Sequence, residues 1–326
     1  MSKLIEISRI HPGHQHHAFT DLVHWRGAYY LCFRSAVHHA PDPNSRITLL
    51  RSTDLEAWDL VWEKSAPDDT RDPKMVASEG RLTVTFVNRF EQDGSMITET
   101  WASWTDDGET WTEPSTVLQD GWRLWRAKQW RGETYLAACR PIPKPPREGY
   151  LYQEVALFRT ADGTAFEQVG TIYSGPEKPN ETSITELPDG GLGALVRREL
   201  PPYHPLWARA DGPEGPWMYL DVGLPMFGPS LLRVGDVVLY AVRIRLSQYE
   251  TQNFSIGAID WHTGQPTELF SLGPWGDASY ATMFCPTEGE LAMTFYAGDR
   301  ERASIYLARF DLEALLSAVG RVPLVP

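Results

Sequence analysis

The chain has 326 residues, a formal net charge of −13 and 42% hydrophobic residues. This length allows either two average domains or one large all-β domain. The acidic balance excludes a general affinity for nucleic acid or anionic membranes. No apolar run approaches about 20 residues, so no membrane span is expected. The N-terminus lacks the apolar core of a signal peptide, which predicts a cytoplasmic protein.

A repeat of about 50 residues runs through the whole sequence. Each copy holds an apolar strand, a turn that usually contains glycine and a second apolar strand, and a further strand pair follows it. We therefore predict an all-β protein: a single six-bladed β-propeller of four-stranded antiparallel blades over residues 1–326. A stacked β-sandwich is the alternative. The blades are predicted to begin near residues 18, 72, 125, 180, 228 and 279.

The two ends of the chain carry further signals. The strand at 303–309 is expected to complete the ring with help from residues 4–8. One short helix is predicted near 311–319. Three cysteines, Cys32, Cys139 and Cys285, lie in apolar strand-like runs and are expected to be buried free thiols.

Hairpin geometry predicts where functional side chains gather. The start of the first strand and the end of the second strand of each blade lie at the same end, so these positions converge around one mouth of the central channel. The starts supply His17, Asp21, Asp72, Arg126, Asn180, Glu181, Asp277 and Tyr280, and the ends supply Arg34, Arg89, Arg140, Arg197, Arg243 and Tyr296. Such arginines offer bidentate donors to a carboxylate or sulfate. Arg89 and Arg140 are also well explained as simple strand ends.

Several segments resemble the sialidase (neuraminidase) superfamily, whose propellers carry BNR or Asp-box repeats. Residues 181–197 are similar to the sialidase segment with a glutamate and a carboxylate-binding arginine. Residues 279–283, with Phe295–Tyr296, resemble the segment that bears the catalytic tyrosine. Thr105–Trp111 resembles an Asp-box turn, and residues 71–74 resemble the opening of the second blade.

The resemblance implies a sialidase-like exo-glycoside hydrolase that acts on an acidic sugar. Tyr280 would be the nucleophile, activated by Glu181, because an unperturbed phenol has a pKa near 10. Arg197 and Arg243 would grip the substrate carboxylate. The family's first arginine motif is absent from residues 11–20, and Arg34 is the candidate substitute. Candidates for the acid/base are Asp21, Asp72, Asp42 and His39, and the remaining substrate-binding candidates are Arg126, His17, Asp277 and Tyr296.

Other functions remain open at this point. A propeller polysaccharide lyase acting on a uronic-acid glycoside would use the same mouth residues, and a non-catalytic carbohydrate-binding propeller would need no nucleophile. Clustered histidines (His14, His16, His17, His38 and His39) suggest a metal site, but no spaced Cys/His pattern supports one. We therefore expect no metal and no cofactor, with a carbohydrate as the partner and the oligomeric state open.

Overall fold

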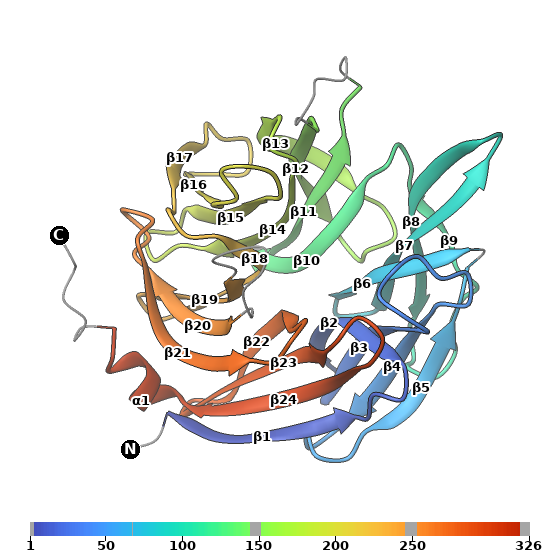
Figure 1. Cartoon of the computed structure of the whole chain (residues 1–326), viewed down its shortest axis with the longest axis horizontal. Helices are drawn as coiled ribbons and strands as arrows, with labels where there is room; N and C mark the ends of the chain where they lie inside the picture. Colours follow the sequence, from blue (N-terminus) through green and yellow to red (C-terminus); the bar gives the residue numbers. More distant parts are fainter. Residues whose placement is uncertain (1–2, 67, 144–150, 245–252, 320–326) are drawn as a thin grey trace.

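The computed structural model describes residues 3–66, 68–143, 151–244 and 253–319. Within these residues the chain forms 24 β-strands and one short helix, which confirms the predicted all-β class. None of the described helical residues belongs to a helix long and apolar enough to cross a membrane. The sheets are set around a common centre (Figure 1).

Strands that follow one another in the sequence pair antiparallel, and four of the resulting sheets have four strands each. The first of these sheets contains β6 (Asp69–Ala77), β7 (Leu82–Gln92), β8 (Ser95–Thr105) and β9 (Ser115–Leu118). The next contains β10 (Arg123–Trp130), β11 (Glu133–Pro141), β12 (Gln153–Thr160) and β13 (Glu167–Gly175). The other two contain β14 (Pro179–Glu186), β15 (Leu192–Arg198), β16 (Leu206–Ala210) and β17 (Met218–Asp221), and β18 (Met226–Val234), β19 (Val237–Ile244), β20 (Asn253–Ile259) and β21 (Pro266–Pro274).

The remaining eight strands join the two ends of the chain. One set contains β2 (His16–Trp25), β3 (Ala28–Ala36), β4 (Arg46–Ser52) and β5 (Asp59–Lys64). The other contains β22 (Ser279–Thr287), β23 (Glu290–Gly298), β24 (Ala303–Asp311) and β1 (Leu4–His11). A single parallel bridge between His16 and Ala303 links the two sets. The antiparallel pairing of β1 with β24 confirms the predicted meeting of the N-terminal and C-terminal strands.

Neighbouring sheets pack through shared apolar cores. The first strands of successive sheets contact one another, and β22 contacts β2. One core joins Trp25 and Leu49 to Met75 and Phe86, residues of adjacent sheets. The all-β architecture of four-stranded antiparallel sheets is therefore confirmed, whereas the six-blade count and the closure of the ring stay predictions.

Two details differ from the sequence predictions. Helix α1 spans only Leu312–Leu316, with the Asp311 side chain capping its first turn by accepting a hydrogen bond from the Ala314 N–H. Cys32 and Cys139 are buried as predicted, but Cys285 is exposed. The pairing of β22 with β23 is irregular between Phe284 and Thr287, which leaves Cys285 at a poorly covered strand end.

In each set of four strands, the hairpin that begins with β2, β6, β10, β14, β18 or β22 carries a register shift near the start of that strand. The shifts follow Ala18, Arg71, Leu124, Pro179, Phe227 and Ser279 on the first strand of each pair. Such β-bulges redirect side chains. Four residues in these bulges have left-handed backbones, namely Phe19 (φ 64°), Asp72 (φ 52°), Gly228 (φ 58°) and Tyr280 (φ 55°). For non-glycine residues this conformation costs about 1–3 kcal/mol and is concentrated at functional sites.

Candidate active site

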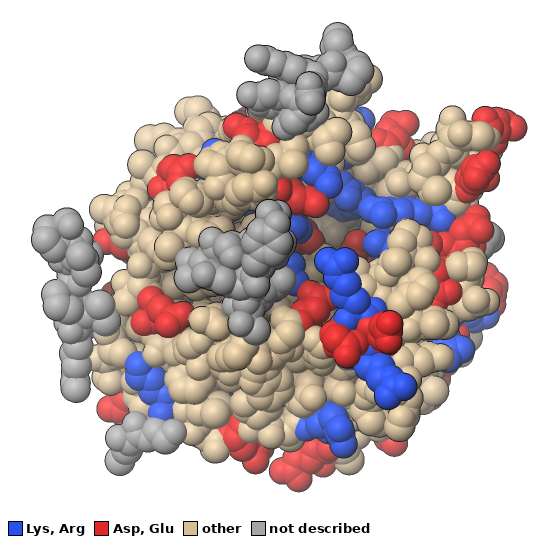
Figure 2. Space-filling view, in the orientation of Figure 1, with Lys and Arg blue, Asp and Glu red and all other residues tan. Residues whose placement is uncertain are grey.

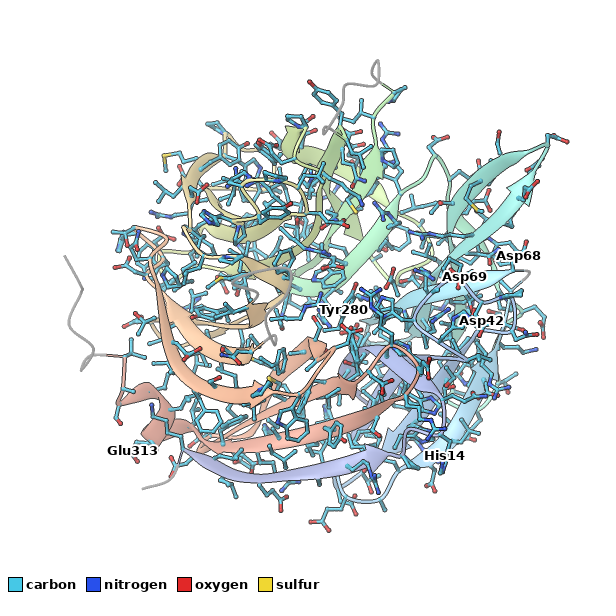
Figure 3. All side chains as sticks on the ribbon, viewed as in Figure 1. His14, Asp42, Asp68, Asp69, Tyr280 and Glu313 are labelled. Carbon is cyan, nitrogen blue, oxygen red and sulfur yellow. The ribbon has the colours of Figure 1, made fainter. Side chains whose placement is uncertain are left out.

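A cavity of about 300 Å³ lies where the bulges converge. Five bulge residues, each from a different hairpin, line it: Phe19, Asp72, Trp125, Glu181 and Tyr280. Figure 2 shows a hollow near the centre of this face with basic and acidic side chains around it, and Figure 3 places Tyr280 near the same centre. The repeated bulge therefore brings side chains from across the sequence to one site.

Tyr280, Glu181 and Arg197 form a connected group on the cavity wall. The Tyr280 hydroxyl donates a hydrogen bond to Glu181 Oε1. The other carboxylate oxygen, Oε2, lies 2.6 Å from Arg197 Nη1. The ring of Tyr280 packs against Trp125 and Phe19, with centroids 4.9 and 5.0 Å away. The three residues for which the sequence predicted nucleophile, base and carboxylate-binding roles are thus brought together.

The electrostatics of this group keep the glutamate ionised and the tyrosine protonated. Burial acts to raise the pKa of Glu181, but the Arg197 charge and the Tyr280 hydrogen bond outweigh it, so the pKa lies below its usual value. Burial, followed by the Glu181 and Asp72 charges, raises the pKa of Tyr280 well above its usual value. An ionised carboxylate in contact with a phenol is arranged to take the phenolic proton.

A second group surrounds Asp277. Its Oδ1 lies 2.5 Å from Arg243 Nη1 and accepts a hydrogen bond from the Tyr296 hydroxyl at 3.4 Å. Its Oδ2 lies 2.9 Å from His39 Nδ1. Burial would raise the pKa of Asp277, but His39 and Arg243 lower it to about 2. Arg243, His39 and Tyr296 line the cavity. Asp277 does not line it but contacts all three side chains.

The cavity is basic although the chain is acidic. Its wall carries six Lys and Arg side chains and three acidic ones. The basic residues are Arg71, Arg89, Arg123, Lys178, Arg197 and Arg243, and the acidic residues are Asp72, Glu181 and Glu199. Four buried guanidinium nitrogens of the arginines on this wall have no hydrogen-bond partner within the described residues: Arg71 Nη2, Arg89 Nε, Arg197 Nε and Arg243 Nε. Buried donors are normally satisfied, so this wall is suited to the oxygens of an anionic ligand.

Sequence reasoning did not identify two of these arginines as site candidates, and it gave Arg89 a structural explanation. Arg71 directly precedes the bulge residue Asp72, and Arg123 lies two residues before the bulge residue Trp125. Arg89, which was equally well explained as a strand end, also lines the cavity, and burial together with Arg71 lowers its pKa. The two arginines do not occupy the same repeat position, because the residue equivalent to Arg71 is Leu124, so no repeat signal identified them.

The structure places Arg34, the candidate for the absent arginine motif, away from the cavity wall. Its side chain is fully buried and lies outside the cavity wall. The guanidinium donates to the carbonyl oxygens of Thr70, His38 and Ala40, and it pairs with Asp69 at 2.8 Å. With its donors engaged by the protein, Arg34 is not free to hold a substrate carboxylate.

Asp21 and Arg126 also do not line the cavity. They form a buried ion pair of 3.1 Å on the far side of the bulges. Arg126 Nη2 donates to the carbonyl oxygens of Thr20 and Tyr280, and Asp21 accepts from the Met75 N–H. These residues therefore hold the backbone that presents Tyr280, and neither acid/base chemistry by Asp21 nor substrate contact by Arg126 fits their positions.

Two further candidates have structural partners. His17 is buried, its Nδ1 lies 2.9 Å from Ser35 Oγ, and it is absent from the cavity wall. Asp42 accepts hydrogen bonds from the Val37 and Asn44 N–H groups and lies well to one side of Tyr280 (Figure 3). Asp72 and His39 are the acid/base candidates that line the cavity.

The chain was compared with known families, curated proteins and solved structures, and only solved structures are similar to it. No family model and no curated protein matches the chain. Trypanosoma rangeli sialidase is similar in structure, with a TM-score of 0.67 at 12% identity over 97% of this chain. The match covers 60% of that sialidase chain, so this chain spans well under its full length.

Two other solved structures share the architecture. Penicillium chrysogenum α-L-arabinanase, complexed with arabinobiose, has a TM-score of 0.62 at 14% identity, covering 96% of this chain and 99% of its own. Bombyx mori β-fructofuranosidase has a TM-score of 0.53 at 13% identity, covering 93% and 63%. These neighbours support a glycosidase-like propeller fold, and at such identities they define the fold alone.

Proposed function

We propose that the protein is a sialidase-like exo-glycoside hydrolase that acts on a sugar bearing a carboxylate. The observation that carries the proposal is the hydrogen bond from Tyr280 to Glu181, with Arg197 on the same carboxylate, at the wall of a cavity that holds unpartnered guanidinium donors. A phenol avoids the repulsion that an acidic sugar would exert on a carboxylate nucleophile.

In the first step, the Tyr280 oxygen attacks the anomeric carbon while its proton passes to Glu181. The glycosidic bond breaks as Asp72 donates a proton to the leaving oxygen. In the second step, Asp72 takes a proton from a water that attacks the same carbon, and Tyr280 departs and regains its proton from Glu181. Asp72 suits this role because it occupies a bulge equivalent to that of Tyr280 and lines the same cavity. His39, the other candidate, also lines the cavity.

The proposal extends to the architecture. We propose that the six sets of four strands close into a single six-bladed propeller, supported by the contact between β22 and β2 and by the pairing of β1 with β24. The Asp-box resemblance at 105–111 is supported by Asp107 Oδ1, which accepts hydrogen bonds from the N–H groups of Glu109 and Thr110.

The size and charge of the cavity set the substrate class. A volume of about 300 Å³ is at the lower end for ligand pockets and suits one sugar unit. The free guanidinium donors favour a carboxylate on that unit. We therefore propose release of a terminal acidic sugar.

The test is a panel of aryl glycosides of acidic sugars, with neutral glycosides for comparison. We expect the wild-type protein to release the aryl group from an acidic member, and Tyr280→Phe to lose more than about 1,000-fold in kcat/KM. Tyr135→Phe is the matched control, because Tyr135 also donates to a glutamate, Glu133, at 2.7 Å but lies outside the cavity. It should retain wild-type activity.

Other outcomes separate the competing functions. Full activity of Tyr280→Phe would refute the mechanism. An unsaturated uronic product, seen by its ultraviolet absorbance, would identify a lyase. Saturable binding of acidic sugars without turnover by the wild-type protein would identify a binding propeller.

A further inference from the structure

Three potential metal ligands converge beside the cavity from three separate segments. His16 opens β2, His39 lies in the loop after β3, and Asp277 lies two residues before β22. One donor atom from each lies within 4.8 Å of the others. The His39 Nδ1–Asp277 Oδ2 distance is 2.9 Å, and the rings of His16 and His39 lie 5.0 Å apart.

The hydrogen bonding of this cluster is incomplete. His16 is fully buried, and neither of its ring nitrogens has a hydrogen-bond partner among the described residues. His39 Nδ1 and Asp277 Oδ2 approach closely, yet their geometry does not satisfy a hydrogen bond. A buried imidazole without partners costs about 1–3 kcal/mol, so the arrangement favours an occupant that binds these atoms.

The distances suit a metal ion as that occupant. Ligand nitrogens and oxygens lie about 2.0–2.2 Å from Zn²⁺, so two of them on a tetrahedral ion are about 3.3 Å apart. The His39–Asp277 pair is already near this separation. The donor atoms lie within 4.8 Å of one another, so closing the remaining distances requires movement of up to about 1.5 Å, to which rotation of the partly exposed His39 side chain can contribute.

The charges also suit a divalent cation. A neutral imidazole offers a lone pair to a metal ion, and the Asp277 carboxylate offers a charged oxygen. Arg34 and Arg243 are the nearby cations, and Asp299 is a further acid that acts on His16. Arg243 binds Oδ1 of Asp277, which leaves Oδ2 for a metal.

We propose that His16, His39 and Asp277 form a binding site for one divalent transition-metal ion, with Zn²⁺ as the probe of choice. Two imidazoles and one carboxylate are a ligand set that such ions prefer. Three protein ligands leave a coordination position open, and because His39 lines the cavity, that position is directed towards a ligand there. The site is independent of the glycosidase proposal, since it requires neither Tyr280 nor Glu181.

Sequence reasoning suggested a broader histidine cluster and set a metal aside. The structure separates its members. His14 lies at the periphery, far from Tyr280 (Figure 3), and His17 bonds Ser35 instead. His38 is exposed and is not part of the cluster. The ligand missing from that reasoning was Asp277, which lies more than 200 residues away in the sequence.

The experiment measures metal binding directly. The full chain, freed of any histidine tag and stripped with a chelator, is titrated with Zn²⁺ by calorimetry, and bound metal is counted by elemental analysis. We expect one Zn²⁺ per chain. With Co²⁺, we expect visible absorption typical of histidine ligation. Loss of an outer-shell partner alone weakens metal binding about 10–100-fold, so His16→Ala, His39→Ala and Asp277→Asn should each weaken it by at least about 100-fold.

His38→Ala is the matched control and should bind as the wild type does, because its side chain is exposed and outside the cluster, and its backbone carbonyl, which accepts from Arg34, is retained. Thermal unfolding of each apo variant identifies variants that fail to fold. If His16→Ala unfolds, His39→Ala decides the question, because this residue is partly exposed and lies in a loop. Absence of stoichiometric binding by the wild type would overturn the proposal, as would binding that persists unchanged in the His39→Ala and Asp277→Asn variants.

Discussion

Replacing Arg34 by methionine should destabilise the protein instead of weakening a ligand contact. The guanidinium of Arg34 satisfies three backbone carbonyls and pairs with Asp69, and both side chains are almost fully buried, at 0% and 6% exposure. Methionine retains much of the volume but none of the donors. Breaking a buried ion pair by removing one partner costs about 3–5 kcal/mol.

The structure narrows that range. Asp69 keeps a second cation, since Arg71 Nε lies 2.6 Å from its Oδ2, and it also accepts from the Asp42 N–H. The Asp69 charge therefore remains partly compensated in the variant, so the cost of breaking the ion pair lies near about 3 kcal/mol. The three carbonyls lose their donors, at about 1 kcal/mol each. Together with the broken ion pair, this gives an expected loss of about 6 kcal/mol, a large fraction of the 5–15 kcal/mol typical of folded proteins.

Urea unfolding followed by tryptophan fluorescence measures this loss as the change in midpoint multiplied by the slope. Arg140→Met is the matched control. Arg140 lies near the end of β11, as Arg34 lies near the end of β3. Arg140 pairs with Glu154, but its side chain is 32% exposed. Its removal should cost less than about 1 kcal/mol. If Arg34→Met matches the wild type in stability and instead binds acidic sugars more weakly, Arg34 is a substrate residue and the reasoning fails.

Two further predictions concern the pH profile and the closing strand. Glu181 must be ionised to accept the Tyr280 proton, and its pKa is lowered, so activity should persist as the pH falls to the ordinary glutamate pKa of 4.5. Arg197→Met should move the acidic limb of the pH–rate profile to higher pH, because it removes the charge that lowers the pKa of Glu181. An acidic limb that does not move would contradict this prediction. Deleting residues 1–11 removes β1 from β24 and uncovers apolar surface, so the urea midpoint should fall by the equivalent of about 3 kcal/mol. An unchanged midpoint would show that β1 does not stabilise the sheet to which it is paired.

The sequence predicted the strand pairs and part of the site for physical reasons. Alternating apolar residues and glycine turns recur with each hairpin, so the sheets could be derived locally. The two-residue turn Arg26–Gly27, for example, has positive φ at both positions, as tight hairpins require. Tyr280 and Glu181 were found because a family resemblance supplied their pairing across 99 residues.

The remaining site residues depended on the bulges, which the sequence did not reveal. Hairpin reasoning assumed regular pairing up to the ends of the strands. An extra residue on one strand changes which side chains face the cavity. Arg126 lies in the same bulge as Trp125, and Asp21 directly follows the bulge in β2. These two residues bond each other, whereas Asp72 and Trp125 line the cavity. A left-handed backbone at Asp72 is not a feature that composition or periodicity predicts.

The net charge of the chain and the charge of the cavity act over different distances. At physiological salt, exposed charges are screened beyond about 8 Å. A long polyanion would meet much of the acidic surface, so the net charge of −13 disfavours it. A single carboxylate inside the cavity is governed by the arginines within contact, whose buried donors are screened far less. An acidic protein with a basic cavity therefore selects small anions over large ones, which is the selectivity that removal of a terminal acidic sugar requires.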